Sequence, residues 1–164
     1  MNTVICCDDN KDFCDLMEIL LQKYQSAYDM KIVKFYDADE LIEFCSNNEF
    51  DIIYLDIELG EKNGLAVAKK LKYINPKALI IYISVYDNYY VDMVQAEPFR
   101  FIKKDASNIE KLEKELVQAF TDAIVRLEEA SKFSFVFQRK EYTVDLNKIK
   151  YFHSVARTIH IHGN

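Results

Sequence analysis

Three acidic residues stand directly after short apolar runs of the sequence, and this pattern carries the clearest chemical meaning. Asp8 and Asp9 follow the first run, and Asp56 follows the third. If these runs are neighbouring parallel strands, the three carboxylates converge at one edge of the sheet. Clustered carboxylates repel one another and attract a hard divalent cation such as Mg²⁺. The alternative is that Asp8 or Asp9 merely caps a helix that starts near Lys11.

A serine and a lysine end two further apolar runs, Ser84 the fourth and Lys104 the fifth. Phosphoryl transfer requires an in-line nucleophile, a metal, a cation and hydrogen-bond donors around the phosphoryl oxygens. The pattern predicts Asp56 as nucleophile, Lys104 as cation, Ser84 as hydroxyl donor, and Asp8 with Asp9 as metal ligands. Taken singly, Lys104 could be a solvated surface residue and Ser84 a turn residue. Their shared position at strand ends makes the set specific.

The elements that must position these side chains alternate along the chain. Nearly continuous apolar runs predict strands buried on both faces, and residues at helical spacing fill the gaps between them. We therefore expect an α/β fold with a five-stranded parallel, doubly wound sheet, helices on both faces, and a site at the carboxyl ends of the strands. The predicted strands are Val4–Cys7, Ile32–Val33, Ile52–Leu55, Leu79–Ile83 and Phe99–Ile102.

The chain changes character after its last predicted helix, which runs from about Ser107 to Glu129 and exceeds the average of about 12 residues. We expect the far end of this helix to project as a connector. Phe133, Phe135 and Phe137 then alternate with other residues, which predicts short antiparallel strands of a different domain type. About 30 such residues cannot close a core alone.

Composition fits one full domain and a remnant, because half of the 164 residues are hydrophobic. A net charge of −6 argues against the chain as a whole being a nucleic-acid binder. The charge is unevenly distributed along the chain. Residues 131–164 carry six basic and two acidic residues, whereas residues 1–130 carry 15 basic and 25 acidic residues. An acidic domain therefore precedes a basic tail.

The four cysteines show no CxxC pair and no zinc-type spacing with the histidines, which predicts buried, reduced thiols. No apolar run approaches the roughly 18 residues of a membrane helix, and residues 1–7 lack the features of a signal peptide. We expect a cytoplasmic protein with no membrane partner.

Four segments of the sequence resemble the receiver domain of response regulators over residues 1 to about 125. That resemblance implies a flavodoxin-like fold and a signalling protein that catalyses only its own phosphorylation and dephosphorylation, as part of a two-component phosphorelay. The segments are Val4-Ile5-Cys6-Cys7-Asp8-Asp9, Ile53-Tyr54-Leu55-Asp56-Ile57-Glu58-Leu59-Gly60 with Gly64, Ile81-Tyr82-Ile83-Ser84, and Phe99-Arg100-Phe101-Ile102-Lys103-Lys104.

The resemblance also implies partners and roles. A sensor histidine kinase would donate phosphate to Asp56, and Mg²⁺ would be held by Asp9, Asp56 and the backbone carbonyl of Glu58, with Asp8 acting mainly through water. The aromatic side chain of Phe101 would turn inward when Ser84 moves toward the phosphate, as a population shift between two packings.

Two residues depart from the receiver pattern. Asp105 replaces the proline that usually follows the lysine with a cis peptide, so we expect a trans bond and a different loop, because a cis bond without proline costs roughly 2.5–4 kcal/mol. Gly60 replaces the proline four residues past the phosphoacceptor, while Gly64 keeps the expected glycine. Lys103 is a second candidate for the role given to Lys104.

The tail resembles the opening strands of a LytTR-type DNA-binding domain, in residues 132–164 and above all in Ile149-Lys-Tyr-Phe-His-Ser. This resemblance implies a receiver over residues 1–125, the end of a linker helix over 126–131, and the N-terminal fragment of that domain over 132–164. It further implies transcription control, with DNA bound only by a full-length parent. Exposed strand edges in the tail could pair with a second copy and give a homodimer.

A pair of histidines and a group of tyrosines each have two possible roles. His160 and His162 alternate along a predicted strand and so face one side, where they could bind a metal or simply face solvent. Tyr86, Tyr89 and Tyr90 begin the predicted fourth helix and could form a dimer surface or pack within the fold.

Two rival functions compete with the phosphorylated receiver. The first is a receiver-like interaction module that is never phosphorylated, which the departures at Gly60 and Asp105 make conceivable. The second is a phosphohydrolase similar to haloacid dehalogenases, suggested by the Asp56-x-Glu58 pair. That family places its nucleophile on the first strand with an aspartate two positions on, whereas here the third strand and a glutamate occupy these places.

Overall fold

A computed structural model describes residues 1–85, 98–156 and 158–163. Within these ranges the chain divides into two compact units, Met1–Ala123 and Ile124–Asn164. The predicted fourth helix, with Tyr86, Tyr89 and Tyr90, lies outside the described residues. Among the described helices, none is long and apolar enough to cross a membrane.

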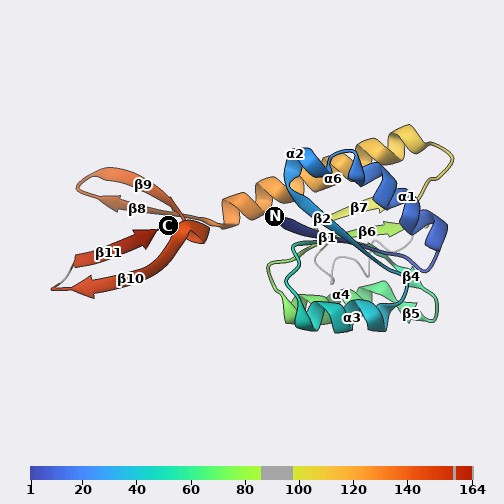
Figure 1. Cartoon of the computed structure of the whole chain (residues 1–164), viewed down its shortest axis with the longest axis horizontal. Coiled ribbons are helices and arrows are strands. Elements are labelled where there is room, and N and C mark those ends of the chain that lie inside the picture. The colour runs from blue at the N-terminus through green and yellow to red at the C-terminus, as the bar shows by residue number, and fades with distance from the viewer. Residues whose placement is uncertain (86–97, 157, 164) are drawn as a thin grey trace. The chain divides into compact units, whose positions relative to one another are not determined.

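The first unit is built on a parallel sheet in the order β2-β1-β3-β6-β7, as Figure 1 shows. This confirms the prediction of a five-stranded parallel sheet with β1 and β3 adjacent. Strand β2 is longer than the apolar run that predicted it, since the polar Lys31 and Lys34 continue its pairing with β1. The strands are β1 (Asn2–Cys7), β2 (Met30–Phe35), β3 (Ile52–Asp56), β6 (Leu79–Ser84) and β7 (Arg100–Lys103).

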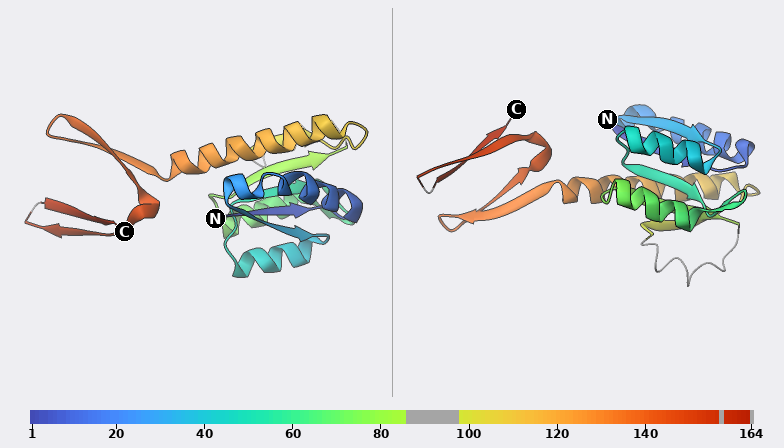
Figure 2. Two further views of the ribbon diagram at one scale, coloured as in Figure 1. Left: turned by 45° about the horizontal axis from the view of Figure 1, so that its top comes forward. Right: turned by 90° about the horizontal axis from the view of Figure 1, so that it is seen from below.

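Helices cover both faces of the sheet, with α1 and α6 on one side and α3 and α4 on the other (Figures 1 and 2). Polar side chains cap α1, α3 and α4, as Asp37 does for α3 by accepting the backbone N–H groups of Asp39 and Glu40. The helices are α1 (Lys11–Gln22), α2 (Gln25–Tyr28), α3 (Ala38–Asn47), α4 (Gly64–Ile74) and α6 (Ile109–Ala130).

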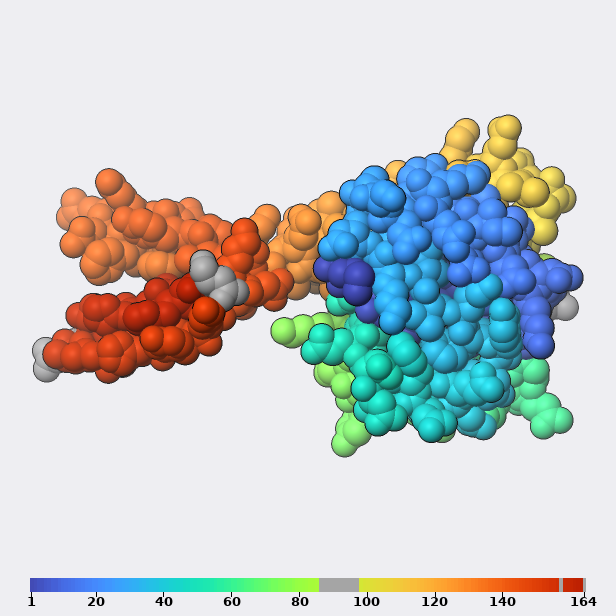
Figure 3. Space-filling view, in the orientation of Figure 1, coloured from blue at the N-terminus to red at the C-terminus, as the bar shows by residue number. Residues whose placement is uncertain are grey.

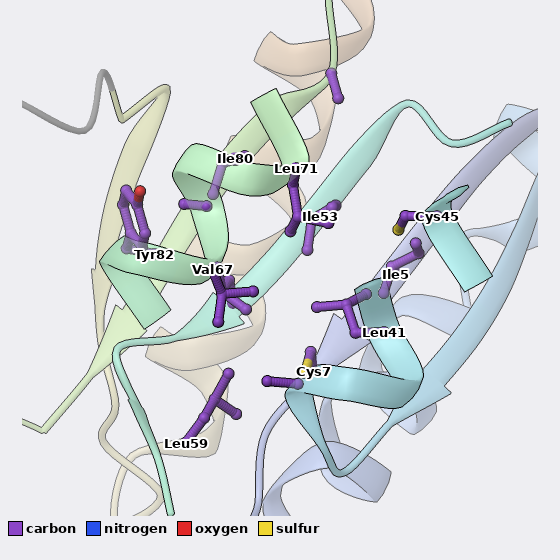
Figure 4. Close-up of a cluster of buried hydrophobic side chains, with 14 of the residues drawn as sticks. Ile5, Cys7, Leu41, Cys45, Ile53, Leu59, Val67, Leu71, Ile80 and Tyr82 are labelled. Carbon is purple, nitrogen blue, oxygen red and sulfur yellow. The ribbon is translucent and has the colours of Figure 1, made fainter. Parts of the chain in front are cut away.

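The core consists of two apolar layers, one on each side of the sheet. Alternate residues of β1 and β3, including Ile5 and Ile53, pack against Leu41 of α3 and Leu71 of α4 (Figure 4). On the opposite face, the hydroxyl of Tyr54 donates a 2.7 Å hydrogen bond to the carbonyl of Leu116 in α6. In the space-filling view little of β1 remains visible (Figure 3). This double coverage explains why the strands read as continuous apolar runs.

The second unit contains two antiparallel hairpins, which confirms the change of strand type after residue 131. Strands β8 (Lys132–Phe137) and β9 (Lys140–Asp145) form the first, through a two-residue turn in which Gln138 and Arg139 both have positive φ. A 3₁₀ turn, η2 (Leu146–Lys148), leads to β10 (Ile149–Val155) and β11 (Thr158–Gly163), which form the second.

Candidate functional site

The carboxyl ends of β1 and β3 bring the three predicted carboxylates together. Asp8 and Asp9 directly follow β1, and Asp56 is the last residue of β3. One carboxylate oxygen from each lies within 4.8 Å of the others. Asp8 and Asp56 are buried, whereas Asp9 is exposed, so the cluster opens to solvent on the Asp9 side.

Lys104 reaches this cluster from the far end of β7 and bridges two of its carboxylates. Its Nζ lies 2.9 Å from Oδ2 of Asp56 and 2.7 Å from Oδ2 of Asp8. The Lys104 side chain is only 12% exposed, so both ion pairs are shielded from water. Lys103, the last residue of β7, has an exposed side chain, whereas Lys104 contacts both carboxylates.

Backbone N–H groups orient each carboxylate. Asp8 Oδ1 accepts the N–H of Asn10 at 2.9 Å, and Asp56 Oδ1 accepts the N–H of Glu58 at 3.1 Å. Asp9 Oδ2 accepts the N–H of Gly60 at 3.1 Å. Each carboxylate therefore has a fixed orientation before any ligand is bound.

Burial and mutual repulsion shape the charges at the site. Burial and the neighbouring Asp56 carboxylate raise the pKa of Asp8 to about 6, against the opposing effect of its hydrogen bond to Lys104. Burial lowers the pKa of Lys104, but its hydrogen bonds to Asp8 and Asp56 outweigh this and raise the pKa overall. The lysine is therefore fully cationic near neutral pH, while the carboxylate cluster carries an excess of negative charge.

The two residues predicted to form a switch lie on β6 and β7. Ser84 is fully buried at the end of β6, and its carbonyl accepts the N–H of Lys104 at 2.7 Å. Phe101 lies opposite Tyr82 in the β6–β7 register and packs half-buried against the core. Ser84 and Lys104 thus belong to one hydrogen-bonded end of the sheet.

A short hairpin after β3 occupies the place where the sequence departs from the receiver pattern. Strands β4 (Glu58–Leu59) and β5 (Lys62–Asn63) are joined by Gly60 and Glu61, with Gly60 at φ +57°. A positive φ at the first turn position favours glycine in a two-residue hairpin turn. Gly60 therefore supplies both the turn and the N–H bound to Asp9, and a proline could supply neither. The sequence pattern did not reveal this hairpin.

Gly64 is required for close packing at the same loop. A Cβ added there would lie 2.1 Å from the backbone carbonyl oxygen of Asp56. Its own N–H donates to the carbonyl of Ile57 at 2.7 Å, and the side chain of Asn63 caps α4 by accepting the N–H of Leu65. The glycine thus lets α4 start directly beside Asp56.

Two further residues near the site were missed by sequence reasoning. Asn10, and neither aspartate, caps α1, because its Oδ1 accepts the N–H of Phe13 at 3.1 Å. The capping role considered for Asp8 or Asp9 is therefore wrong. The buried ring of Phe13 lies 4.6 Å from Nζ of Lys104, in a cation–π contact. The sequence pattern did not indicate this contact.

Asp105 replaces the usual proline without disrupting the loop. The described residues contain no cis peptide bond, as expected for a lysine followed by aspartate. Oδ1 of Asp105 accepts the N–H of Ser107 at 3.0 Å, forming a side-chain turn ahead of α6. The departure from the receiver pattern therefore has a local structural role.

The arrangement has a definite chemical capacity. The exposed side of the cluster faces a cleft to which the β4–β5 hairpin contributes, and the carboxylate oxygens can hold a hard divalent cation. Asp56 presents a carboxylate to this cleft, beside the largely shielded ammonium group of Lys104. The cleft is lined by Asp9, Asn10, Asp56, Ile57, Glu58, Gly60, Glu61, Lys62, Asn63, Val85 and Lys104.

Two curated relatives of the chain are named sensory transduction proteins. It is 26% identical over 101 residues to the sensory transduction protein LytR of Streptococcus agalactiae, a match that covers 62% of this chain and 41% of that protein. It is 27% identical over 105 residues to the sensory transduction protein LytT of Bacillus anthracis, a match that covers 63% of this chain and 42% of that protein. The matched region spans about two fifths of the length of these relatives.

Solved structures share the fold of the first unit. A response regulator of Burkholderia pseudomallei, with a phosphorylated aspartic acid, a calcium ion and citrate, has a TM-score of 0.61 at 24% identity, covering 79% of this chain and 74% of its own. The response regulator domain of Thermotoga maritima CheB has a TM-score of 0.64 at 22% identity, covering 76% of this chain and 97% of that domain's chain. The profile of the response regulator receiver domain matches residues 4–117. The chain therefore belongs to the response regulator receiver domain family.

Proposed function

We propose that this chain accepts a phosphoryl group on Asp56 from a sensor histidine kinase and so acts as the regulator of a two-component system. One carboxylate oxygen of Asp56 attacks phosphorus, the bond between phosphorus and the donor histidine breaks, and an acyl phosphate forms. The observation that carries the proposal is Lys104 Nζ, which lies 2.9 Å from Asp56 Oδ2 in the cleft that both residues line. The Burkholderia pseudomallei structure, with its phosphorylated aspartate, supports it by analogy of fold.

The residues present fit a magnesium ion, because three carboxylate oxygens lie within 4.8 Å of one another and one side of the cluster is open. We assign Asp9, Asp56 and the backbone carbonyl of Glu58 as ligands, with Asp8 acting through water. When bound, Mg²⁺ neutralises charge that develops on the phosphoryl oxygens. The N–H of Gly60 orients Asp9 for this role.

Lys104 and Ser84 complete the phosphoryl site in this proposal. Lys104 exchanges its contact with Asp56 Oδ2 for one with a phosphoryl oxygen, while its contact with Asp8 holds it in place. The Ser84 hydroxyl donates to a second phosphoryl oxygen. Its movement gives Phe101, which is half-buried against the core, room to turn inward and to change the surface near β7.

The output of the full-length protein is proposed from its LytR and LytT relatives and from the sequence of the tail. We assign residues 1–125 to the receiver, 126–131 to the end of the linker helix and 132–164 to part of a LytTR-type DNA-binding domain. The parent protein would then control transcription in the cytoplasm. Exposed apolar side chains such as Phe137 and Ile159 favour a homodimer formed through the tail.

Intact-mass spectrometry after incubation with acetyl phosphate and Mg²⁺ tests the phosphoacceptor. We expect a gain of one phosphoryl group, roughly 80 Da, that disappears in Asp56→Asn and in the presence of EDTA. Asp12→Asn is the matched control, because it removes an exposed carboxylate from α1 and should leave the mass gain intact.

Two other outcomes would point to the rival functions. No mass gain in the folded wild-type chain would contradict the proposal and favour a receiver-like interaction module that is not phosphorylated. Continuous release of phosphate from small phosphate esters would favour a phosphohydrolase, although Asp56 lies on the third strand in sequence order of the parallel sheet rather than the first.

A further inference from the structure

The hairpin of β10 and β11 has two chemically different faces. Phe152, Ile159 and Ile161 lie on one face and line an apolar groove together with aromatic residues of β8. The opposite face carries all three histidines of the chain, because His153 pairs with His160 and His162 lies two residues further along β11. The register of the hairpin therefore gathers the chain's imidazoles in one place, which the sequence indicated for only two of them.

The ring of His153 lies close to the rings of both His160 and His162. The ring centroids of His153 and His160 are 5.5 Å apart, and those of His153 and His162 are 6.0 Å apart. Tyr151 stacks on His162 at 4.4 Å with an interplanar angle of 15°, which fixes one side of the cluster. Two histidines therefore flank a third that projects from the neighbouring strand.

These spacings lie within about 1 Å of what a metal ion would require. With Zn–N bonds of about 2.0–2.1 Å in a tetrahedral site, two bound imidazoles have centroids about 5 Å apart. The observed separations of His153 from His160 and from His162, 5.5 and 6.0 Å, exceed this by 1 Å or less, so small side-chain rotations would allow His153 to share an ion with each of them. Such rotation is needed, because the donor atoms that already converge in the described residues are those of the aspartate cluster.

An unsatisfied nitrogen also marks this face. Nε2 of His162 is buried and has no hydrogen-bond partner among the described residues. Buried polar atoms in folded proteins almost always have a partner, often a water or an ion. A bound metal would satisfy this nitrogen, whereas solvent-facing histidines would leave no such atom buried.

We propose that His153, His160 and His162 form a binding site for a divalent transition metal of the Zn²⁺ or Cu²⁺ class, with water as a fourth ligand. Neutral imidazole suits these ions, whereas Mg²⁺ prefers oxygen ligands. The site belongs to the second unit of the chain, and it differs from the carboxylate cluster in ligand type and metal preference. It is independent of the proposed phosphorylation, so either can fail without the other.

Titration of the 164-residue chain with Co²⁺, followed by displacement with Zn²⁺, tests the site. Saturating Mg²⁺ occupies the carboxylate cluster, and visible absorption reports tetrahedral cobalt. We expect one equivalent to bind, and His153→Ala, His160→Ala and His162→Ala each to weaken binding by about tenfold or more. Ser154→Ala is the matched control, because Ser154 is an exposed neighbour on the other face of β10 and its loss should leave binding unchanged.

Three results would overturn the proposal: no cobalt bound, unchanged binding in a His153→Ala/His160→Ala double variant, or a thiolate-to-cobalt charge-transfer band, which would place the metal on cysteines. Histidine-ring NMR of the wild-type chain gives an answer even if a variant fails to fold. One equivalent of Zn²⁺ should shift the ring resonances of all three histidines together, and a shift of none or of one would contradict a shared site.

Discussion

The two units of the chain present polar groups in opposite ways. In the unit Met1–Ala123 the sheet is covered on both faces, so Asp8, Asp56 and Lys104 are held at its end with little access to water. In the unit Ile124–Asn164 the strands form open hairpins, and aromatic residues such as Phe137 stay 58% exposed. Double coverage lets a sheet fix charges in a low-dielectric environment, which two isolated hairpins cannot do.

The contrast also concerns the backbone around each group. The site carboxylates accept backbone N–H groups from Asn10, Glu58 and Gly60, all within a few residues of the strand ends. In the described part of the second hairpin, strand register and ring stacking hold the histidines. Backbone hydrogen bonds orient the side chains of the first arrangement, whereas side-chain contacts and register position those of the second.

The largest expected effect on stability comes from truncating a buried side chain in the core of the first unit. Leu71→Ala empties a fully buried position between α4 and the sheet and should lower the free energy of unfolding by about 3–5 kcal/mol. Phe137→Ala in the tail should lower it by no more than about 0.5 kcal/mol, because the ring is largely exposed. Urea denaturation followed by circular dichroism measures both. Equal losses would show that the tail is buried against something and would break the comparison.

Glycine substitutions compare backbone packing in the two units. Gly64→Ala places a methyl group 2.1 Å from the backbone oxygen of Asp56 and should destabilise the first unit by about 3 kcal/mol, at the upper end for overpacking. It should also slow phosphorylation, because Asp56 shifts. Gly163→Ala meets the carbonyl of Lys148 at 3.0 Å and should leave phosphorylation unchanged. Wild-type kinetics in Gly64→Ala would show that the loop is free to move.

The pH dependence of the free energy of unfolding tests how much the buried Asp8 carboxylate destabilises the fold. The folded chain raises the pKa of Asp8 from 3.8 to about 6, so it binds more protons than the unfolded chain between these values. Its stability therefore falls as pH rises through this window. Asp8→Asn should raise the free energy of unfolding at pH 8, without divalent cations, by about 1–3 kcal/mol, and the gain should vanish below pH 4. A destabilised variant at pH 8 would mean that the Lys104 contact dominates.

The smallest expected effect separates a functional aromatic contact from a surface one. Phe13→Leu removes the ring beneath Lys104 and should slow phosphorylation of Asp56 by acetyl phosphate about two- to fivefold, as for loss of about 0.5–1 kcal/mol. Phe13→Tyr keeps the ring and should retain the rate. Phe135→Leu disrupts an aromatic stack in the tail and should have no effect on this rate. A slow Phe13→Tyr variant would indicate packing damage rather than a cation–π role.

Local sequence alone determined much of this protein. Continuous apolar runs identified the strands of the parallel sheet, and the residues that end them identified Asp8, Asp9, Asp56, Ser84 and Lys104 as candidates. Alternating residues after Ser131 indicated the antiparallel strands. These features are predictable because side-chain periodicity and strand ends are properties of adjacent residues.

Only the tertiary structure decided how distant groups meet. Three contacts at the site join separate elements. Lys104 bridges Asp8 and Asp56, the ring of Phe13 lies beneath Lys104, and the N–H of Gly60 donates to Asp9. The alignment of His153 with His160 depends on hairpin register, which sequence spacing leaves open. Local patterns choose each element, but contacts between elements depend on how the whole chain packs, and the chemistry of this protein lies in those contacts.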